Sequence, residues 1–157
     1  MSLLIRNVLF TIIVPGTGAV VVPWMILGGK SATDGLPAWI GAVLIGAGLV
    51  LYLWCLWLFA KVGRGTPGPW DAPRHLVVVG PYRWVRNPIY LAAFAVIAGQ
   101  AALFASLPVL VWGVVAAVFE HVFVVAYEEP TLEATFGAEY TAYRTSVRRW
   151  LPTPPRT

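Results

Sequence analysis

The chain is organised around one polar stretch, Gly80-Pro-Tyr-Arg-Trp-Val-Arg-Asn-Pro-Ile-Tyr90. Two arginines, two tyrosines and a tryptophan fall within these eleven residues, and two long apolar segments lie on either side of the stretch along the chain. Asn87 followed by Pro88 predicts the start of a helix, with the Asn side chain as N-cap and the proline in the first turn. We therefore expect a helix to enter an apolar environment directly after a cluster of polar side chains.

Composition indicates that this apolar environment is a membrane. Hydrophobic residues make up 59% of the 157 residues and charged residues 11%, whereas a typical soluble domain has about 45–50% and about 25%. The mean hydropathy is +0.75, and repeated apolar runs of this length are typical of transmembrane helices. The net charge of +4 comes from residues in loops beside apolar segments, as in proteins that face anionic lipid. We therefore expect a membrane partner and no nucleic acid.

Four apolar segments predict four transmembrane helices, and the predicted fold class is an all-α integral membrane protein with a single domain over residues 1–157. The run from Pro15 to Gly18 predicts a kink in the first span. The last two spans are joined by a tip without charged residues, so we expect them to form a helical hairpin. Each predicted span is close to the roughly 20 residues that cross a bilayer, and the four cover residues 3–27, 37–60, 88–107 and 108–127.

The segments outside the spans predict a loop and one further helix. Residues 61–87 are rich in Gly and Pro, which is typical of a loop. After the fourth span, apolar residues recur at spacings of three and four, which predicts an amphipathic helix over residues 128–150, lying on the membrane surface or folded back over the bundle. The glycines at positions 41, 46 and 48 favour close helix packing and permit a homodimer.

Basic residues predict the orientation of the chain. The segment from Lys61 to Arg86 contains five basic residues and one acid, and four basic residues follow Glu139. By the positive-inside rule, both termini and the 61–87 loop should face the cytoplasm, in the cytoplasmic (inner) membrane. The polar chemistry of the chain then gathers at one face.

The hairpin should bring together polar side chains that are far apart in the sequence. A hairpin that starts at Pro88 returns near residue 127 to the membrane depth of its start. Ionisable groups at this depth are costly unless they are paired or face a watery cavity. The sequence therefore predicts one pocket shared by Arg83, Arg86, Asn87, Tyr90, Glu128 and Glu129. The alternative is that these arginines and glutamates only form ion pairs that close the hairpin. The chain has two histidines and one cysteine, and we expect no metal site.

Two motifs resemble the signatures of a known family. The stretch Gly80–Tyr90 resembles the first signature of the isoprenylcysteine carboxyl methyltransferase and phospholipid methyltransferase family. The loop before it, Gly63-Arg-Gly-Thr-Pro-Gly-Pro69, resembles the family's bacterial members. The second motif is Glu128-Glu129-Pro-Thr-Leu-Glu-Ala-Thr-Phe-Gly-Ala-Glu-Tyr-Thr-Ala-Tyr143, which resembles the family's Glu pair followed by Leu, Phe-Gly and two tyrosines. The motifs stand in the family's order, and the resemblance covers residues 60 to 152 or so.

The resemblance implies a membrane enzyme that transfers a methyl group from S-adenosylmethionine to a lipophilic acceptor. In the family, the loop before Gly-x-Tyr, the Asn-Pro-x-Tyr segment and the Glu pair surround the cofactor. We add two arginines to the implied contacts, because guanidinium groups suit the cofactor's carboxylate. The expected cofactor-binding residues are therefore Arg74, His75, Leu76, Val77, Tyr82, Arg83, Arg86, Asn87, Pro88, Ile89, Tyr90, Glu128 and Glu129.

The acceptor stays open among a phospholipid amine, an isoprenoid-linked carboxylate, and a hydrophobic thiol or hydroxyl. The eukaryotic prenylcysteine enzymes have His at the position of Asn87, and an Arg several residues before the Glu pair where this chain has His121. These differences argue against a prenylcysteine carboxylate. An amine acceptor must lose a proton, and Glu120, His121 and Glu128 are the candidate bases.

Two other classes of function compete with the enzyme. A small non-enzymatic membrane protein could use the same Arg and Glu residues to lock helices or to bind anionic lipid. A transporter is less favoured, because the spans lack polar residues along a path and no repeat is apparent. Binding of S-adenosylmethionine would separate the enzyme from both.

Overall fold

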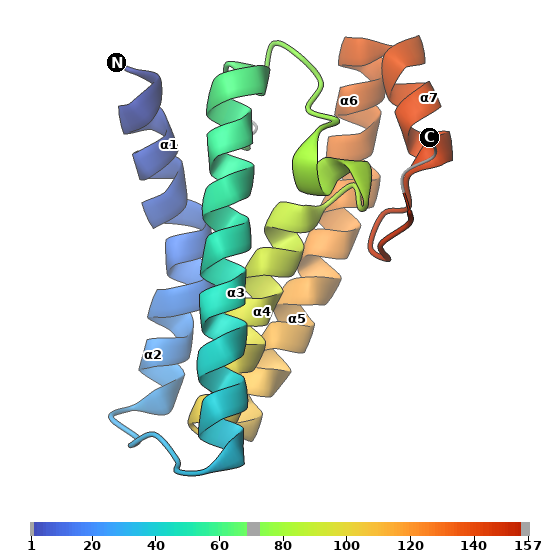
Figure 1. The fold of residues 1–157 in the computed structure, drawn as a ribbon. Coiled ribbons are helices and arrows are strands. Elements are labelled where there is room, and N and C mark those ends of the chain that lie inside the picture. The colour runs from blue at the N-terminus through green and yellow to red at the C-terminus, as the bar shows by residue number, and fades with distance from the viewer. Residues whose placement is uncertain (1, 69–72, 155–157) are drawn as a thin grey trace.

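The computed structural model describes residues 2–68 and 73–154, and every regular element in these residues is a helix (Figure 1). The predicted all-α fold is therefore confirmed. Three helical runs are long and apolar enough to cross a membrane: Ile5–Leu27, Leu36–Gly63 and Leu107–Phe136. The protein is an integral membrane protein, with long spans at three of the four predicted places.

The first span contains a π-helical segment around its proline. It consists of α1 (Leu3–Thr11), the π-helix η1 (Ile12–Val21) and α2 (Val22–Leu27). Pro15 lies inside η1, where its missing N–H disturbs the regular hydrogen bonding of a helix. Two later side chains bond to carbonyls of this segment: Trp112 Nε1 donates to Gly18 O at 2.8 Å, and Gln100 Nε2 donates to Ala19 O at 2.7 Å. The irregularity expected at Pro15 is thus a widened helix held by the hairpin.

The second span and the first helix of the hairpin pack with their backbones in contact. The second span is α3 (Leu36–Leu58), which continues into the π-helix η2 (Phe59–Gly63), and its partner is α4 (Pro88–Leu103). A Cβ atom on Gly41 would lie 2.6 Å from Gly99 O, and one on Gly48 would lie 2.7 Å from Ala92 O. At Gly46 nothing lies within 4 Å. Two of the three glycines therefore serve packing within the chain.

The helix α4 is shorter than the predicted span over residues 88–107. Its 16 residues give a length of about 24 Å, against roughly 30 Å for the hydrocarbon core of a bilayer. It ends because a tight turn follows, in which Ala105 has φ +41°. The loop before α3 binds this end, since Lys30 Nζ donates to Ala105 O at 2.9 Å and Thr33 N donates to Leu103 O at 2.8 Å. The hairpin continues into α5 (Leu107–Phe123).

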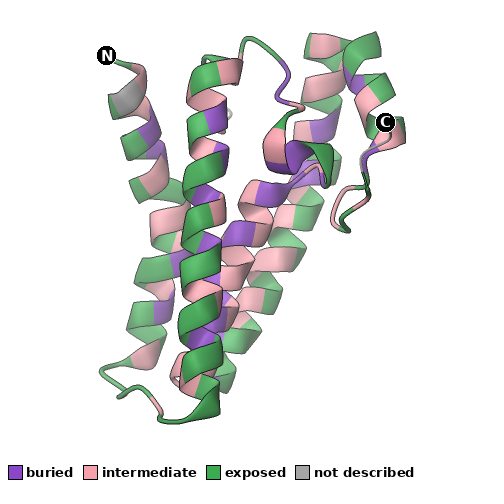
Figure 2. Cartoon of the chain, in the orientation of Figure 1, coloured by how far each residue is buried: buried purple, intermediate pink, exposed green. Residues whose placement is uncertain are grey.

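Apolar side chains lie on the outside of the bundle as well as in its core. Figure 2 shows exposed residues along the outer faces of α3 and α5. One buried cluster joins the first span to the hairpin and consists of Ala19, Val96, Ile97, Ala101 and Val109. Large apolar residues exposed on the outer faces include Trp39, Val43, Val50, Val114, Val118 and Phe119. This distribution is the one expected where lipid, and not water, surrounds the helices.

The segment after the fourth span does not form the single amphipathic helix predicted over residues 128–150. The helix α5 continues through the π-helix η5 (Val124–Glu128) into α6 (Glu129–Phe136), and α7 (Ala138–Ser146) follows. Gly137 separates them with φ 52° and ψ −124°, a backbone conformation that glycine adopts easily. That prediction was wrong because α6 extends the fourth span and the chain is extended after Ser146. The start of α1, the end of α3 and α7 lie at the same end of the bundle (Figure 1).

Candidate active site

Two pockets share one wall. The first, called here the bundle pocket, lies among η1, α3, α4 and α5 and has about 740 Å³ of empty space, its open mouth included. The second, called the loop pocket, has about 730 Å³ on the same basis and lies between the loop before α4 and the α5–α6 helix. The residues that line both pockets are Phe59, Pro67, Tyr82, Arg86 and Glu128.

Tyr82 stands in the shared wall on a short 3-10 helix, η4 (Gly80–Arg83). Gly80 has φ +59°, and a Cβ atom there would lie 2.9 Å from the Leu58 side chain, so glycine lets η4 rest against α3. The Tyr82 side chain is 5% exposed, and its hydroxyl lies beside the Cys55 thiol without an oxygen or nitrogen partner among the described residues. Burial raises the pKa of Tyr82 well above its ordinary value, so this hydroxyl stays neutral and able to donate.

Arg86 in the same wall uses only part of its guanidinium group in an ion pair. Its Nη1 atom lies 3.1 Å from Glu129 Oε1 and also donates to the Tyr140 hydroxyl at 3.3 Å. Its Nε atom is buried and has no partner among the described residues. A buried polar group without a partner costs about 1–3 kcal/mol. The unpaired Tyr82 hydroxyl and Arg86 Nε together mark the shared wall as a place for a polar ligand.

Carboxylates face the bundle pocket from α5 and η5. Glu128 accepts a hydrogen bond from the Tyr90 hydroxyl at 2.8 Å, which joins the start of α4 to the end of the fourth span, as the hairpin predicted. Glu120 lies two helical turns earlier and lines the same pocket, next to Tyr90 and Phe94. This pocket therefore combines apolar walls with two acidic groups.

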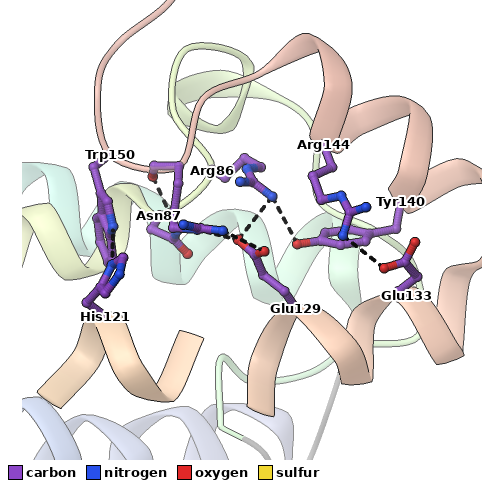
Figure 3. A network of polar contacts seen from close by, with 9 residues as sticks. Arg86, Asn87, His121, Glu129, Glu133, Tyr140, Arg144 and Trp150 are labelled. Atoms are coloured by element: carbon purple, nitrogen blue, oxygen red, sulfur yellow. Dashed lines mark hydrogen bonds and ion pairs between the residues drawn. The ribbon is translucent and has the colours of Figure 1, made fainter. Parts of the chain in front are cut away.

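Glu129 has a different environment from its neighbour Glu128. It is 7% exposed, and its two carboxylate oxygens accept from Arg149 Nε at 2.6 Å and Arg149 Nη2 at 2.9 Å. Figure 3 shows the Glu129 carboxylate pointing toward the guanidinium of Arg86, with Tyr140 beside them. Glu129 lines neither pocket. It links the polar stretch to the C-terminal segment.

A model of the phospholipid methyltransferase family matches residues 36–139, about two thirds of the chain. The chain belongs to the phospholipid methyltransferase family. The resemblance seen in the two motifs is thereby confirmed, and so is the prediction of an S-adenosylmethionine-dependent membrane methyltransferase over the non-enzymatic alternative. The matched segment contains all five residues shared by the two pockets. No curated protein and no solved structure matches the chain.

The loop pocket of this phospholipid methyltransferase has the donor set that the family's cofactor needs. The Arg86 Nε and Tyr82 hydroxyl groups are donors without a partner among the described residues, and the Glu128 carboxylate is an acceptor. The side chains of Phe123 and Tyr127 lie with ring centroids 5.1 Å apart at one wall, and aromatic faces suit an adenine or a sulfonium. Apolar side chains complete the walls: Leu76, Val77 and Leu132. These residues fit S-adenosylmethionine.

The predicted site residues divide into two groups. The pockets bring together nine of them: Leu76, Val77, Tyr82, Arg86, Asn87, Ile89, Tyr90, Glu120 and Glu128. The other predicted residues do not line these pockets. Arg74, His75 and Arg83 are exposed, Pro88 is buried in the first turn of α4, and Glu129 forms the ion pairs described above.

Two predicted roles change in the structure. Asn87 does precede α4, but its side chain makes no cap hydrogen bond. Its Nδ2 atom donates to Arg149 O at 3.2 Å, which ties the amide to the C-terminal segment. His121 is exposed, and its Nδ1 atom accepts from Trp150 Nε1 at 3.0 Å. That bond holds the His121 ring against Trp150 of the C-terminal segment (Figure 3), and His121 is not among the residues that line the bundle pocket.

The sequence reasoning missed residues at both ends of the chain. Phe10 and Tyr52 line the bundle pocket, and Tyr52 bonds to the Thr11 hydroxyl at 2.8 Å. Nothing in the first two spans distinguishes these residues from other apolar or aromatic positions. Arg149 and Trp150 were also missed, although a basic residue beside an aromatic one, at the very end of the predicted amphipathic helix, was a usable signal.

Proposed function

We propose that this protein transfers a methyl group from S-adenosylmethionine to the amine nitrogen of a phospholipid headgroup. In this proposal the loop pocket holds the cofactor and the bundle pocket holds the headgroup. The observation that carries the proposal is the shared wall, because a methyl group can pass directly only between two ligands whose pockets meet.

On the cofactor side, Arg86 and Tyr82 bind the carboxylate through their unpaired donors. Leu76, Val77 and Leu132 bury the apolar part of the ligand. Glu128 reaches both pockets and accepts hydrogen bonds from the cofactor's amino group or ribose hydroxyls. The family to which the chain belongs uses S-adenosylmethionine, and these assignments extend that property to single residues.

On the acceptor side, charge favours an amine. Glu120 and Glu128 face the bundle pocket, and the guanidinium of Arg86, which also lines it, already pairs with Glu129. A headgroup ammonium would gain two carboxylate neighbours there, whereas a carboxylate acceptor would be repelled by them. The apolar walls contributed by Phe94, Ala93 and Val14 suit the part of the lipid that carries no charge.

The chemistry requires proton removal and exclusion of water. S-adenosylmethionine supplies an electrophilic methyl group on a sulfonium sulfur. Glu120 or Glu128 takes the proton of the headgroup ammonium, which frees the nitrogen lone pair. With the cofactor bound, this nitrogen would accept the methyl group as its bond to sulfur breaks, and the leaving group would be a neutral thioether. Tyr90, through its hydrogen bond to Glu128, keeps that carboxylate oriented toward the pocket, and the aromatic walls keep water from competing as a nucleophile.

The site would lie at the cytoplasmic face. The exposed basic residues Lys61, Arg64, Arg74 and Arg83 belong to the same loop as the shared wall, and the positive-inside rule assigns such a loop to the cytoplasm. Soluble S-adenosylmethionine can reach a pocket on that face, while the lipid acceptor enters from the bilayer.

The purified protein in detergent should bind S-adenosylmethionine in calorimetric titration. With the methyl-labelled cofactor, it should produce N-methylated lipid in vesicles that contain phosphatidylethanolamine and none in vesicles of phosphatidylglycerol, which has no amine. The double substitution of Glu120→Gln and Glu128→Gln should lower this rate by roughly 100-fold or more. A folded protein that binds no cofactor at millimolar concentration would refute the proposal. Methylation of phosphatidylglycerol vesicles would overturn the choice of an amine.

A further inference from the structure

The C-terminal segment Val147–Thr153, called here the strap, lies against the polar stretch that precedes α4. It leaves α7 in an extended conformation, with φ −123° and ψ 132° at Val147. Arg86 N donates to Arg148 O at 2.9 Å, and Thr153 N donates to Trp84 O at 2.7 Å. The strap lies outside the residues matched by the family model, so its role has to be read from its contacts.

Arg149 anchors the strap to the fourth span. Its guanidinium binds both oxygens of Glu129, at 2.6 and 2.9 Å, and its carbonyl accepts from Asn87 Nδ2. A two-pronged Arg–carboxylate pair holds both partners in a defined geometry. Glu129 in turn pairs with Arg86 at 3.1 Å, which lines both pockets. Arg149 therefore orients a residue of the shared wall through one intermediate side chain.

Trp150 supports the other side of the site. Its ring packs against Tyr90 and Phe94, with centroid distances of 6.3 and 6.2 Å, and against His121 at 6.1 Å. Its indole N–H is held by His121 Nδ1 at 3.0 Å (Figure 3). Tyr90 and Phe94 line the bundle pocket from the inside, and Tyr90 donates to Glu128. Trp150 thus backs the wall that orients Glu128.

We propose that Arg149 and Trp150 are positioning residues for methyl transfer, acting on Glu128 from two directions. Arg149 holds the neighbouring residue Glu129 and through it Arg86, while Trp150 holds the hydrogen-bonding partner Tyr90. Neither side chain lines the bundle pocket or the loop pocket. The inference rests on the proposed function. It adds that the strap holds the side chains of the site in their positions. Rigid support of this kind matters because a displacement of about 1 Å in a catalytic group can reduce the rate by about 100-fold.

The test compares five variants of the full-length protein: Arg149→Ala, Arg149→Lys, Trp150→Ala, Trp150→Phe and, as the matched control, Arg148→Ala. Arg148 is exposed, and the contact described above uses its backbone carbonyl, so the control removes the same charge from the same strap. For each variant we would measure the melting temperature, the dissociation constant of S-adenosylmethionine, and kcat and KM on vesicles containing phosphatidylethanolamine.

Both alanine variants at positions 149 and 150 should lower kcat per folded protein by about 10- to 100-fold, and Arg148→Ala should not. The split between ligands is the sharper expectation. Trp150→Ala should raise the KM of the lipid more than it weakens cofactor binding, because Tyr90 and Phe94 line the bundle pocket alone and reach the loop pocket only through Glu128. Arg149→Ala should weaken cofactor binding as well, through Arg86.

The conservative variants distinguish a role in positioning the site from a role in the stability of the whole protein. Trp150→Phe keeps a ring against Tyr90 and should recover most of the kcat that the alanine variant loses. Arg149→Lys cannot bind both oxygens of Glu129 and should recover little. If the variants melt at lower temperature but keep the wild-type kcat per folded protein, the strap is only structural and the inference is wrong. A wild-type protein that binds no cofactor refutes the proposed function and this inference with it; an active wild type whose position-149 and position-150 variants match Arg148→Ala overturns the inference alone.

Discussion

Two adjacent glutamates of this protein have separate surroundings. Glu128 lines both pockets and accepts from Tyr90, whereas Glu129 is enclosed by Arg86 and Arg149. Successive residues of a helix point about 100° apart, so neighbours at one membrane depth can serve different partners. A sequence motif that contains both residues cannot separate their roles. Their charged surroundings separate the two roles, because only the Glu129 carboxylate is paired with two arginines.

Substitution of the two glutamates by glutamine should therefore affect different properties of the protein, stability in one case and methyl transfer in the other. Glu129→Gln removes a buried charge from between two arginines and should lower the free energy of unfolding by about 3 kcal/mol. Glu128→Gln should leave stability nearly unchanged and reduce methyl transfer strongly. Thermal unfolding in detergent and the labelled-methyl assay measure the two effects. Glu133→Gln is the control for stability, because its pair with Arg144 is 41% exposed on both sides and contributes little. Equal stability of Glu129→Gln and Glu133→Gln would contradict the assignment.

The elements follow from the sequence wherever local pattern and packing agree. Residues 37–60 were predicted as a span, and α3 with η2 occupies them; Pro88 was predicted as a helix start, and α4 begins there. The predicted hairpin by itself brings Arg86, Tyr90 and Glu128 together. Asn87 was misjudged because its amide has a choice of partners, and the strap's carbonyl is available only in three dimensions.

Other features depend on backbone conformations that composition does not reveal. The end of α4 at Leu103 depends on a positive φ at Ala105, a residue type that normally continues helices. The division between α6 and α7 depends on Gly137, although the periodicity of apolar residues runs through it. The ion pair of Arg149 with Glu129 depends on the path of the strap, since several arginines nearby in the sequence were equally good partners.

Contact between α3 and α4 predicts which glycines tolerate a methyl group. Gly41→Ala and Gly48→Ala place a Cβ within 2.6 and 2.7 Å of backbone oxygens of α4, and such overpacking costs about 1–3 kcal/mol. Gly46→Ala meets open space and should be neutral or stabilising by up to about 1 kcal/mol, since alanine favours helix. Melting temperatures of the three variants in one detergent test this ordering. A destabilised Gly46→Ala would show that its face is covered by something other than lipid.

At the scale of the whole molecule, the two ends of the bundle differ in chemistry. One end carries η4, α7 and the strap; the other carries the loop between α2 and α3 and the hairpin tip (Figure 1). Methyl transfer from a soluble cofactor requires that the first end face the cytoplasm. The orientation is therefore linked directly to function.

Cysteine labelling in intact cells tests this orientation. Cys55 is the single cysteine and is fully buried, so labelling of the wild-type protein by a maleimide should be low. Thr145→Cys on α7 and Ser31→Cys before α3 introduce exposed thiols at the two ends. A membrane-impermeant maleimide added outside the inner membrane should label position 31 and spare position 145. The reverse pattern would place the pockets on the wrong side for a cytosolic cofactor.

The short α4 has a consequence for the lipid itself. A helix of about 24 Å beside spans of 23, 28 and 30 residues does not match the thickness of a typical bilayer. All residues of α4 are buried or half-buried. Where its half-buried side meets lipid, the bilayer must become thinner, or headgroups must sink toward the polar start of the helix. The protein would then draw its acceptor below the level of the surrounding headgroups. Initial rates should fall as the acyl chains of the host bilayer lengthen at constant phosphatidylethanolamine content, so bilayer thickness becomes a determinant of turnover.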